Sequence, residues 1–269
     1  MTTATTPSRI SQAFADLAAR GEKALMPYVT VGHPLKESTL EIVPALVEGG
    51  ATMIELGIPF SDPLADGPTI QRSGYQALQN GVTMEFCMET ARQLRQQGVE
   101  VPLILMGYYN PVLRYGLERF VADSAESGID GFIIPDLPPD ESAELAELSQ
   151  AYQRDLIFMV APTSRDQHIA SLSGRASGFI YCVSVTGVTG ARDDVSADLA
   201  GFLSRVRSAL DLPLAVGFGI STPEHVQEVG RDADGVIVGS ALISRLDEAD
   251  PAEAPTVARE FMRYLRGNA

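Results

Sequence analysis

The fold is constrained most tightly by the segment Ile54-Glu55-Leu56-Gly57-Ile58-Pro59-Phe60-Ser61-Asp62-Pro63-Leu64-Ala65-Asp66-Gly67-Pro68. Apolar residues from Ala51 to Ile58 suit a buried parallel strand, and the Pro, Ser, Asp and Gly residues that follow end this strand in a loop. Glu55 is therefore placed near the end of a buried strand. A carboxylate there is costly to bury unless it is paired, hydrogen-bonded or protonated, so its presence needs a reason.

Two reasons remain open from the residues alone. Glu55 can be catalytic, because carboxylates with perturbed pKa values gather in active sites. It can equally form a salt bridge with a buried arginine, with Asp62 and Asp66 serving only as caps of the next helix, because structural networks perturb carboxylates too.

The composition favours a single domain and argues against several classes of partner. A chain of 269 residues with 45% apolar content can bury a full core, and single-domain α/β barrels commonly have this size. The chain carries 35 acidic and 20 basic residues, whereas nucleic acid or an anionic membrane would require a basic face. An anionic small ligand would have to be held by local backbone N–H groups.

The cysteines and the N-terminus favour a cytoplasmic location. Cys87 and Cys182 are far apart and lack metal-ligand spacing, so neither a disulfide framework nor a zinc site is expected. The segment from Met1 to Arg9 is rich in Thr and Ser without an apolar core, and no apolar stretch approaches the roughly 18 residues of a membrane span. Residues 1–8 are predicted to be a disordered extension.

Short runs rich in Val, Ile, Leu and Phe alternate with segments of helical period, which is the pattern of repeated βα units. Eight strands are predicted, at Leu25–Val31, Thr52–Gly57, Leu103–Met106, Gly131–Pro135, Leu156–Val160, Gly178–Val183, Leu214–Gly217 and Gly235–Val238. The segments between them predict amphipathic helices, for example Ser38–Glu48 and Pro139–Ala151.

Eight such units predict a closed (β/α)8 TIM barrel, with residues 9–269 as one domain and Arg9–Arg20 as an extra N-terminal helix over the bottom. An open doubly wound sheet is the weaker alternative. In a barrel the active site lies at the C-terminal ends of the strands. Glu55 with the following loop, Asp136 after the fourth strand and Tyr181 on the sixth are therefore expected to face one mouth.

Glycines after the last two strands predict a phosphate site. Gly217-Phe218-Gly219-Ile220-Ser221 and Gly239-Ser240 place small residues where backbone must approach a ligand closely, and a short helix, Ala241–Leu246, follows. Backbone N–H donors and a helix dipole form the recurrent phosphate site of barrels at this place. The alternative is that these glycines only make tight turns.

The segment Ser184–Asp194 after the sixth strand predicts a mobile lid, because it contains two glycines and many small polar residues. Its closure would exclude water and could bring Thr189 to a catalytic carboxylate and Gly190 to the phosphate. An ordinary surface loop is equally compatible with these residues.

Other catalytic groups are poorly placed. Lys23 precedes the first strand, at the wrong end of the barrel, and Lys36 lies where the next helix begins, so a Schiff base is not expected. His33, His168 and His225 are scattered, which argues against a metal cluster. Acid–base catalysis by carboxylates is the chemistry that remains.

With these residues in view, the chain closely resembles the α subunits of tryptophan synthase over nearly its whole length, from Met26-Pro27-Tyr28-Val29-Thr30-Val31-Gly32 to Gly239-Ser240-Ala241. The most specific parts are the run from Glu55 to Pro68, Gly187-Val188-Thr189-Gly190 and Gly217-Phe218-Gly219-Ile220-Ser221. The resemblance implies retro-aldol cleavage of indole-3-glycerol phosphate to indole and glyceraldehyde 3-phosphate in tryptophan biosynthesis, with no cofactor in this chain.

The resemblance also implies roles for two catalytic carboxylates. Glu55 protonates the indole ring at C3 and, directly or through water, helps to remove the proton from the glycerol hydroxyl next to the bond that breaks. Asp66 accepts a hydrogen bond from the indole N–H and stabilises the positive charge on the ring. Glu55 in an apolar strand is therefore expected to have a raised pKa, and Asp66 in a polar loop is expected to stay ionised.

The other site residues follow from the same resemblance. Tyr181 would help to position Glu55 and the substrate, whereas Asp62 and Asp136 match positions near the partner interface and the loop network. The implied substrate-binding residues are Tyr28, Leu105 and Tyr108 in the indole pocket, Tyr181, Thr189 of the lid, Phe218, and Gly190, Gly219, Gly239 and Ser240 around the phosphate.

A partner is implied as well, namely the pyridoxal-phosphate-dependent β subunit in an α2β2 heterotetramer, which receives indole without its release into water. Low activity of the isolated chain is then expected. His33 stands where the family often has an acidic residue, which puts contacts of that loop with the partner in doubt. The alternatives are another phosphate-binding barrel, such as an isomerase or indole-glycerol-phosphate synthase, and a non-catalytic activator of a partner subunit.

Overall fold

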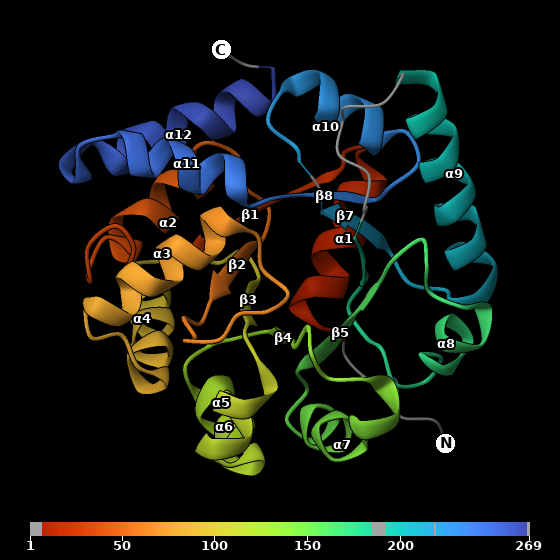
Figure 1. The fold of residues 1–269 in the computed structure, drawn as a ribbon, viewed down its shortest axis with the longest axis horizontal. Coiled ribbons are helices and arrows are strands. Elements are labelled where there is room, and N and C mark those ends of the chain that lie inside the picture. The colour runs from red at the N-terminus through yellow and green to blue at the C-terminus, as the bar shows by residue number, and fades with distance from the viewer. Residues whose placement is uncertain (1–6, 184–191, 218, 268–269) are drawn as a thin grey trace.

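Eight parallel strands close into a barrel surrounded by helices in the computed structural model, which describes residues 7–183, 192–217 and 219–267 (Figure 1). The strands are β1 (Ala24–Thr30), β2 (Ile54–Gly57), β3 (Leu103–Met106), β4 (Gly131–Ile133), β5 (Asp155–Val160), β6 (Ile180–Val183), β7 (Leu214–Gly217) and β8 (Gly235–Val238). Each strand pairs with the next, and β8 pairs with β1. The predicted TIM barrel is confirmed, because a doubly wound sheet would leave two edges open.

The predicted strands all occur, with small differences at their ends. β4 ends at Ile133 rather than at Pro135, which lacks the N–H group that a strand ladder requires. β6 begins at Ile180 rather than at Gly178, whose φ of 75° is outside the extended region.

Helices surround the barrel, and β2, β3 and β8 are each followed by two helices instead of one. They are α1 (Arg9–Ala19), α2 (Thr39–Glu48), α3 (Pro68–Gln79), α4 (Met84–Gln96), α5 (Tyr109–Tyr115), α6 (Leu117–Glu126), α7 (Ala143–Ala151), α8 (Asp166–Ser171), α9 (Arg192–Ala209), α10 (Pro223–Gly230), α11 (Ser240–Glu248) and α12 (Ala254–Leu265), with two short 3₁₀ helices, η1 (Pro139–Glu141) and η2 (Pro251–Glu253). Among the described residues, no helix has the length and apolar character that a bilayer crossing requires.

The helix predicted over Pro139–Ala151 is divided into η1 and α7. Ser142 lies at the junction, where its hydroxyl donates to the carbonyl of Pro139 at 2.7 Å. A side chain that takes up a backbone carbonyl in this way competes with the regular helix ladder, which accounts for the break.

Alternate residues of each strand form two separate apolar layers. The inner layer fills the barrel and includes Ala24, Met26, Met53, Ile104, Ile133, Ile157, Ala215 and Ile237. The outer layer joins the strands to the helices and includes Leu25, Val29, Ile54, Leu56, Leu103, Leu105, Phe132 and Val236. Since Met53 faces inward, the same alternation places Glu55 and Gly57 on the inner face of β2.

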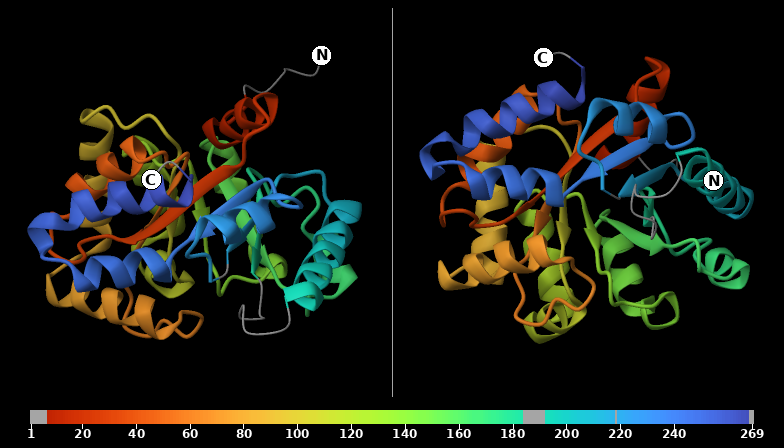
Figure 2. Two further views of the ribbon diagram at one scale, coloured as in Figure 1. Left: turned by 90° about the horizontal axis from the view of Figure 1, so that it is seen from above. Right: turned by 45° about the horizontal axis from the view of Figure 1, so that its top comes forward.

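Helix α1 closes the bottom of the barrel, as the sequence predicted (Figure 2). Its apolar side chains Ile10, Phe14 and Leu17 are buried in the inner layer. The ring centroids of Phe14 and Phe179 lie 5.7 Å apart. The bottom is therefore filled by side chains, which leaves the opposite end of the strands for a ligand.

Ser8 begins this helix and corrects one sequence prediction. Its hydroxyl oxygen accepts from the Ser11 N–H at 3.1 Å, and the hydroxyl donates to the carboxylate of Asp155 at 2.5 Å. Ser8 is thus an ordered N-cap and not part of a disordered extension. The rest of that predicted extension, apart from Pro7, lies outside the described residues.

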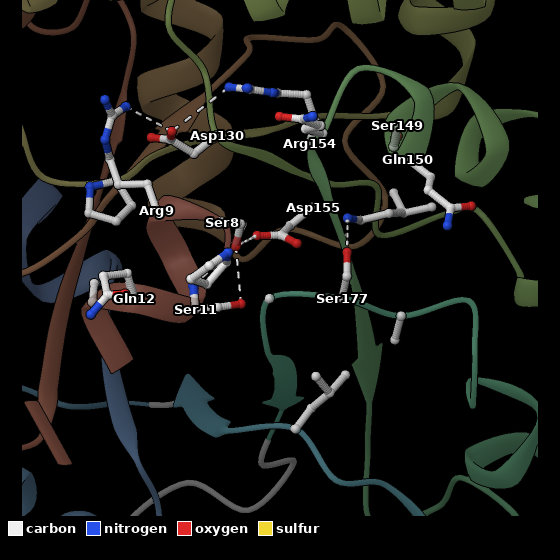
Figure 3. Close-up of a pocket in the computed structure, with 18 of the residues that line it drawn as sticks. Ser8, Arg9, Ser11, Gln12, Asp130, Ser149, Gln150, Arg154, Asp155 and Ser177 are labelled. Carbon is white, nitrogen blue, oxygen red and sulfur yellow. Dashed lines mark hydrogen bonds and ion pairs between the residues drawn. The ribbon is translucent and has the colours of Figure 1, made fainter. Parts of the chain in front are cut away.

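A cluster of charged side chains lies beside α1 at the bottom (Figure 3). The two carboxylate oxygens of Asp130 lie 2.9 Å from Arg9 Nη1 and 2.6 Å from Arg95 Nη2, and Arg154 Nη1 is 3.9 Å away. Asp130 also accepts from the Leu103 N–H at 2.9 Å. These contacts satisfy a carboxylate that is only 4% exposed.

A groove of about 1530 Å³ runs around α1 at this end, lined by α1, by α7 and by loops that precede the strands. Figure 3 shows that its buried carboxylates are already engaged, Asp130 with arginines and Asp155 with Ser8. Catalytic residues of barrel enzymes lie at the C-terminal ends of the strands. We therefore locate the candidate active site at the mouth and not in this groove.

Candidate active site

Glu55 projects from β2 into the barrel near its C-terminal mouth, opposite Tyr28 of β1 and Ile104 of β3 in the strand register. Its side chain is completely buried, and neither carboxylate oxygen has a hydrogen-bond partner in the described part of the chain. Burial raises the pKa of Glu55 to about 8, because the charged form loses its hydration. The expected raised pKa is confirmed, and no described arginine forms the alternative salt bridge.

Two tyrosines lie near Glu55, each over a glycine of the neighbouring strand. A Cβ atom on Gly57 would overlap the phenol of Tyr28, and one on Gly217 would overlap the phenol of Tyr181. Burial raises the pKa of both phenols, and the negative charges of Asp66 and Glu55 raise them further. The two hydroxyls are therefore neutral near pH 7 and can donate hydrogen bonds in the mouth.

Asp66 lies in the loop between β2 and α3, and Tyr108 holds this loop in place. The Tyr108 hydroxyl accepts from the Ala65 N–H at 2.9 Å, and its ring packs on Phe60 with centroids 5.3 Å apart. Gln71 of α3 donates to the Asp66 carbonyl at 2.9 Å. Burial raises the pKa of Asp66, and a hydrogen bond with the Tyr108 hydroxyl opposes that increase.

Leu105 does not face the mouth, which corrects its expected place in the indole pocket. It is completely buried in the outer layer, whereas its neighbours Ile104 and Met106 face the inside of the barrel. The two-residue period of a strand explains the error, since a shift of one residue reverses the face. Met106, and Met159 of β5 with the same orientation, are inward residues that sequence reasoning missed.

Strand alternation is the signal that could have found Met106. Gly57 lies opposite Met106 in the register of β2 and β3, just as Glu55 lies opposite Ile104. Every second residue of β2, starting from Glu55, faces inward, and the residue paired with it on β3 faces inward too.

The glycines after β7 and β8 lie at the predicted end of the barrel. Gly219 has a φ of 52°, a conformation that favours glycine. Gly239 caps α11, which begins at Ser240, and a Cβ atom on Gly239 would lie 3.7 Å from the Cβ of Tyr28. The positive end of the α11 dipole therefore borders the same mouth as Tyr28.

Several predicted residues lie outside the described part of the chain. They are Thr189, Gly190 and Phe218, together with residues 184–191 of the expected lid. The last three residues of that predicted lid, from Arg192 to Asp194, belong to the first turn of α9, so the connection is shorter than the sequence indicated.

The two acidic residues assigned by resemblance to the partner side lie on the exposed rim of the mouth. Asp136 accepts from the N–H of Tyr109, the first residue of α5, at 2.8 Å. Asp62 accepts from the hydroxyl of Ser61 at 2.5 Å. Asp62 thus stabilises its own loop, whereas Asp136 links the loop after β4 to the start of α5, and both carboxylates are accessible.

The lysines and most histidines lie away from Glu55. Lys23 donates to a backbone carbonyl before β8, at the bottom, and the Lys36 ammonium lies 4.9 Å over the ring of Phe86. His168 and His225 are in α8 and α10. Within the residues that the structure describes, no group of three or more His, Cys, Asp or Glu side chains could hold a metal ion.

His33 has a partner within the chain that the sequence did not reveal. Its Nε2 atom lies 2.8 Å from a carboxylate oxygen of Asp247 in α11, and the side chain is buried. Burial lowers the pKa of His33, whereas Asp247 raises it. His33 therefore links the loop after β1 to the helix that begins at Ser240.

The geometry agrees with comparisons to known proteins. The family model described as tryptophan synthase alpha chain matches residues 14–266. The chain belongs to the tryptophan synthase alpha chain family.

Relatives of this alpha chain match it over nearly the full length. The Chloroflexus aggregans alpha chain is 57% identical over 258 residues, covering 96% of this chain and 97% of that protein. The Roseiflexus castenholzii alpha chain is 55% identical, covering 97% and 100%. Among solved structures, tryptophan synthase subunit alpha from Legionella pneumophila has a TM-score of 0.91 at 36% identity, with 98% of both chains covered.

Membership of the tryptophan synthase alpha chain family fixes the reaction class. The protein is a carbon–carbon lyase of tryptophan biosynthesis that cleaves indole-3-glycerol phosphate. The predicted activity is confirmed, and neither a different barrel enzyme nor a non-catalytic activator is favoured. An alpha chain also implies a β-chain partner.

Proposed function

We propose that Glu55 is the general acid and base of the cleavage. The observation that carries this proposal is a buried carboxyl group at the mouth, without a partner among the described residues and with a pKa of about 8. At pH 7 such a group is about nine-tenths protonated, so it holds a proton for C3 of the indole ring. The carboxylate that remains can then accept the proton of the glycerol hydroxyl next to the breaking bond.

Asp66 is proposed to stabilise the ring during this step. Its negative charge raises the pKa of both Tyr28 and Tyr181, which supports a place close to the interior of the mouth. An ionised carboxylate there can accept a hydrogen bond from the indole N–H and offset the positive charge that follows protonation at C3. Tyr108 supports this role by holding the Asp66 loop through Ala65.

The substrate is proposed to lie across the mouth, from the tyrosines to the start of α11. Tyr28, Tyr108, Tyr181 and Met106 supply aromatic and apolar contacts for the ring. The phosphate is assigned to the positive end of the α11 dipole, with the substrate-binding residues Gly219, Gly239 and Ser240, and with Thr189, Gly190 and Phe218 contributing from segments outside the described residues.

The cleavage is proposed to need no cofactor in this chain. A retro-aldol step requires an acceptor for the electrons of the breaking C–C bond, a role that a Schiff base or a metal ion fills in other enzymes. Protonation of C3 turns the indole ring into a cationic imine that accepts those electrons directly. Glu55 as proton donor and Asp66 as counter-charge are then sufficient.

The assembly is proposed to be an α2β2 heterotetramer in the cytoplasm, with pyridoxal phosphate bound only by the β subunit, which receives the indole. Support comes from the family and from the solved tryptophan synthase of M. tuberculosis, in which the matched chain is 34% identical with a TM-score of 0.86. The exposed rim residues Asp62 and Asp136 are assigned to the side that meets the partner.

Indole release from indole-3-glycerol phosphate tests these roles. The purified chain is assayed alone and with a β chain, as wild type, Glu55→Gln and Asp66→Asn. We expect activity to rise with the partner and to fall at least about 100-fold in Glu55→Gln, because the amide holds no transferable proton. Glu41→Gln, at an exposed site of α2, is the matched control and should retain wild-type activity.

Two results would contradict the proposal. Substantial cleavage by Glu55→Gln would remove Glu55 from the acid–base role. Equal rates for the isolated chain and the assembled complex would refute activation by the partner.

A further inference from the structure

A chain of buried hydroxyl groups leads from the mouth into helix α3. The hydroxyl oxygen of Thr30, the last residue of β1, lies 3.4 Å from the Tyr28 hydroxyl and 2.7 Å from the Ser73 hydroxyl. The Ser73 hydroxyl lies 2.9 Å from the carbonyl of Ile70. Thr30 and Ser73 are each 1% exposed. The proposed acid–base mechanism assigns no role to this chain.

This hydroxyl chain joins the two parts of the active site that carry the two carboxylates. Tyr28 lies opposite Glu55 in the register of β1 and β2. Ser73 lies in α3, whose N-cap Gly67 directly follows Asp66. The bonds between these hydroxyls are thus a side-chain link between the barrel wall beside Glu55 and the helix that starts at the Asp66 loop.

The direction of the hydrogen bonds decides which proton Tyr28 can offer to the mouth. Thr30 donates its single proton to the Tyr28 hydroxyl, so Ser73 must be the donor in the bond between Ser73 and Thr30. The Ile70 carbonyl is a second acceptor within reach of the Ser73 proton. Because the Tyr28 oxygen accepts from Thr30, the phenol keeps its own proton for an acceptor in the mouth.

Sterically, the phenol of Tyr28 is held from the other sides as well. Gly57 leaves only enough room for the phenol, and a Cβ atom on Gly239 would lie 3.7 Å from the Cβ of Tyr28. Gly57 is two residues beyond Glu55 on the same inward face of β2. The Tyr28 hydroxyl therefore borders the space on the mouth side of Glu55.

We propose that Thr30 and Ser73 are positioning residues of the cleavage reaction, which hold the Tyr28 phenol beside Glu55 and fix its distance from the Asp66 loop. They touch no reacting atom and act through Tyr28. This inference rests on the proposed roles of Glu55 and Asp66. Because Thr30 and Ser73 are not among the residues assigned to the phosphate and act only on the Tyr28 hydroxyl, loss of the link should lower kcat more than it changes KM.

Thr30→Val tests the proposal, since it removes the hydroxyl and keeps the shape of the side chain. The assay measures indole release with a β chain in excess. The kcat of the variant should be roughly 2- to 10-fold below the wild-type value, as expected for one lost hydrogen bond, and its KM should stay within about twofold of wild type. Thr30→Ser restores the hydroxyl and should restore kcat. A normal kcat in Thr30→Val would overturn the proposal.

The matched control is Thr90→Val in α4. Thr90 is 3% exposed, and its hydroxyl donates to the Phe86 carbonyl at 2.8 Å, away from the mouth. The Thr90→Val variant should have a lower free energy of unfolding and a wild-type kcat. Equal losses of kcat in Thr30→Val and Thr90→Val would show a general packing effect and overturn the proposal. Ser73→Ala, compared with Ser142→Ala, makes the same test if Thr30→Val does not fold.

Two further measurements separate this inference from the proposed function. Tyr28→Phe combined with Thr30→Val should be no slower than the slower single variant, because both changes break one chain, and multiplicative losses would overturn the link. Glu55→Gln is run in the same assay. Activity in that variant would refute the acid–base proposal, whereas an inactive Glu55→Gln beside fully active Thr30→Val and Ser73→Ala would refute only the positioning roles.

Discussion

Buried carboxylates are paired at one end of the barrel and unpaired at the other, among the residues that the structure describes. At the bottom, Asp130 meets three arginines and a backbone N–H, and Asp155 accepts from Ser8. At the mouth, Glu55 is more deeply buried and has no such partner among the described residues. Burial of a carboxyl group is thus common to both ends, and the missing partner distinguishes the end that carries out chemistry.

The largest effect on stability is expected at the bottom. Asp130→Asn removes the charge that faces three arginines, and we expect the free energy of unfolding to fall by about 3 kcal/mol. The kcat of the folded variant should stay at the wild-type value. Urea unfolding followed by circular dichroism measures the first quantity and indole release the second.

Asp140→Asn is the control for this change. Asp140 is 89% exposed and pairs with Arg175 at the surface. The free energy of unfolding of Asp140→Asn should therefore stay within about 0.5 kcal/mol of the wild-type value. If both variants lose the same stability, the contrast between a satisfied bottom and an unsatisfied mouth is wrong.

The next effect is the pH dependence that Glu55 confers. Its pKa rises from an ordinary 4.5 to about 8 on folding, so the folded chain binds more protons than the unfolded chain between these values. This contribution to stability is full at low pH and is lost as pH rises through 8, by at most about 1.4 kcal/mol per pH unit.

Glu55→Gln removes this dependence. The stability of the variant relative to wild type should therefore increase from about pH 5.5 to about pH 7.5, measured by urea unfolding at each pH. Identical pH slopes for the two proteins would mean that Glu55 is ionised and satisfied in the folded state, like Asp130.

A smaller effect is expected from Gly57→Ala at the mouth. The added methyl group displaces the Tyr28 phenol, which should lower stability by roughly 1–3 kcal/mol and lower kcat as well. Gly201→Ala in α9 meets no atom within 4 Å and should raise stability by about 0.5–1 kcal/mol without changing kcat. A normal kcat in Gly57→Ala would show that catalysis does not depend on the position of the Tyr28 phenol.

The smallest effect concerns the N-cap at the bottom. Ser8→Ala removes the hydrogen bonds to the Ser11 N–H and to Asp155 and should cost about 1 kcal/mol, with no change in kcat. Ser8→Thr keeps the hydroxyl and should retain the wild-type stability. A change in kcat without a change in melting temperature would show that α1 influences the mouth.

The fold was predictable because its signals are local. Each strand is a short apolar run with Gly, Pro or Asp at its ends, and eight repeats permit few other arrangements. The same locality explains Glu55, since a carboxylate inside an apolar strand is visible in the sequence. Leu105 was assigned to the indole pocket by resemblance and not by strand alternation. Alternation from Glu55 selects Met106 on the paired strand instead.

The rest of the site depends on contacts between distant residues. His33 meets Asp247 from 214 positions away, and Thr30 meets Ser73 from 43 positions away. No period or turn signal specifies such pairs. Whether Glu55 would be paired or unpaired was open for the same reason, since an arginine from any strand could have reached it.

The seal at the bottom of the barrel also determines when folding can finish during protein synthesis. Helix α1 leaves the ribosome before any barrel strand, yet the inner apolar layer in which it packs includes Phe179, Ala215 and Ile237, which are synthesised much later. Until β8 exists, the apolar face of α1 has no complete place to bind. A helix that precedes every barrel strand is therefore among the last to dock, and chaperones and proteases meet the growing chain while that face is still uncovered.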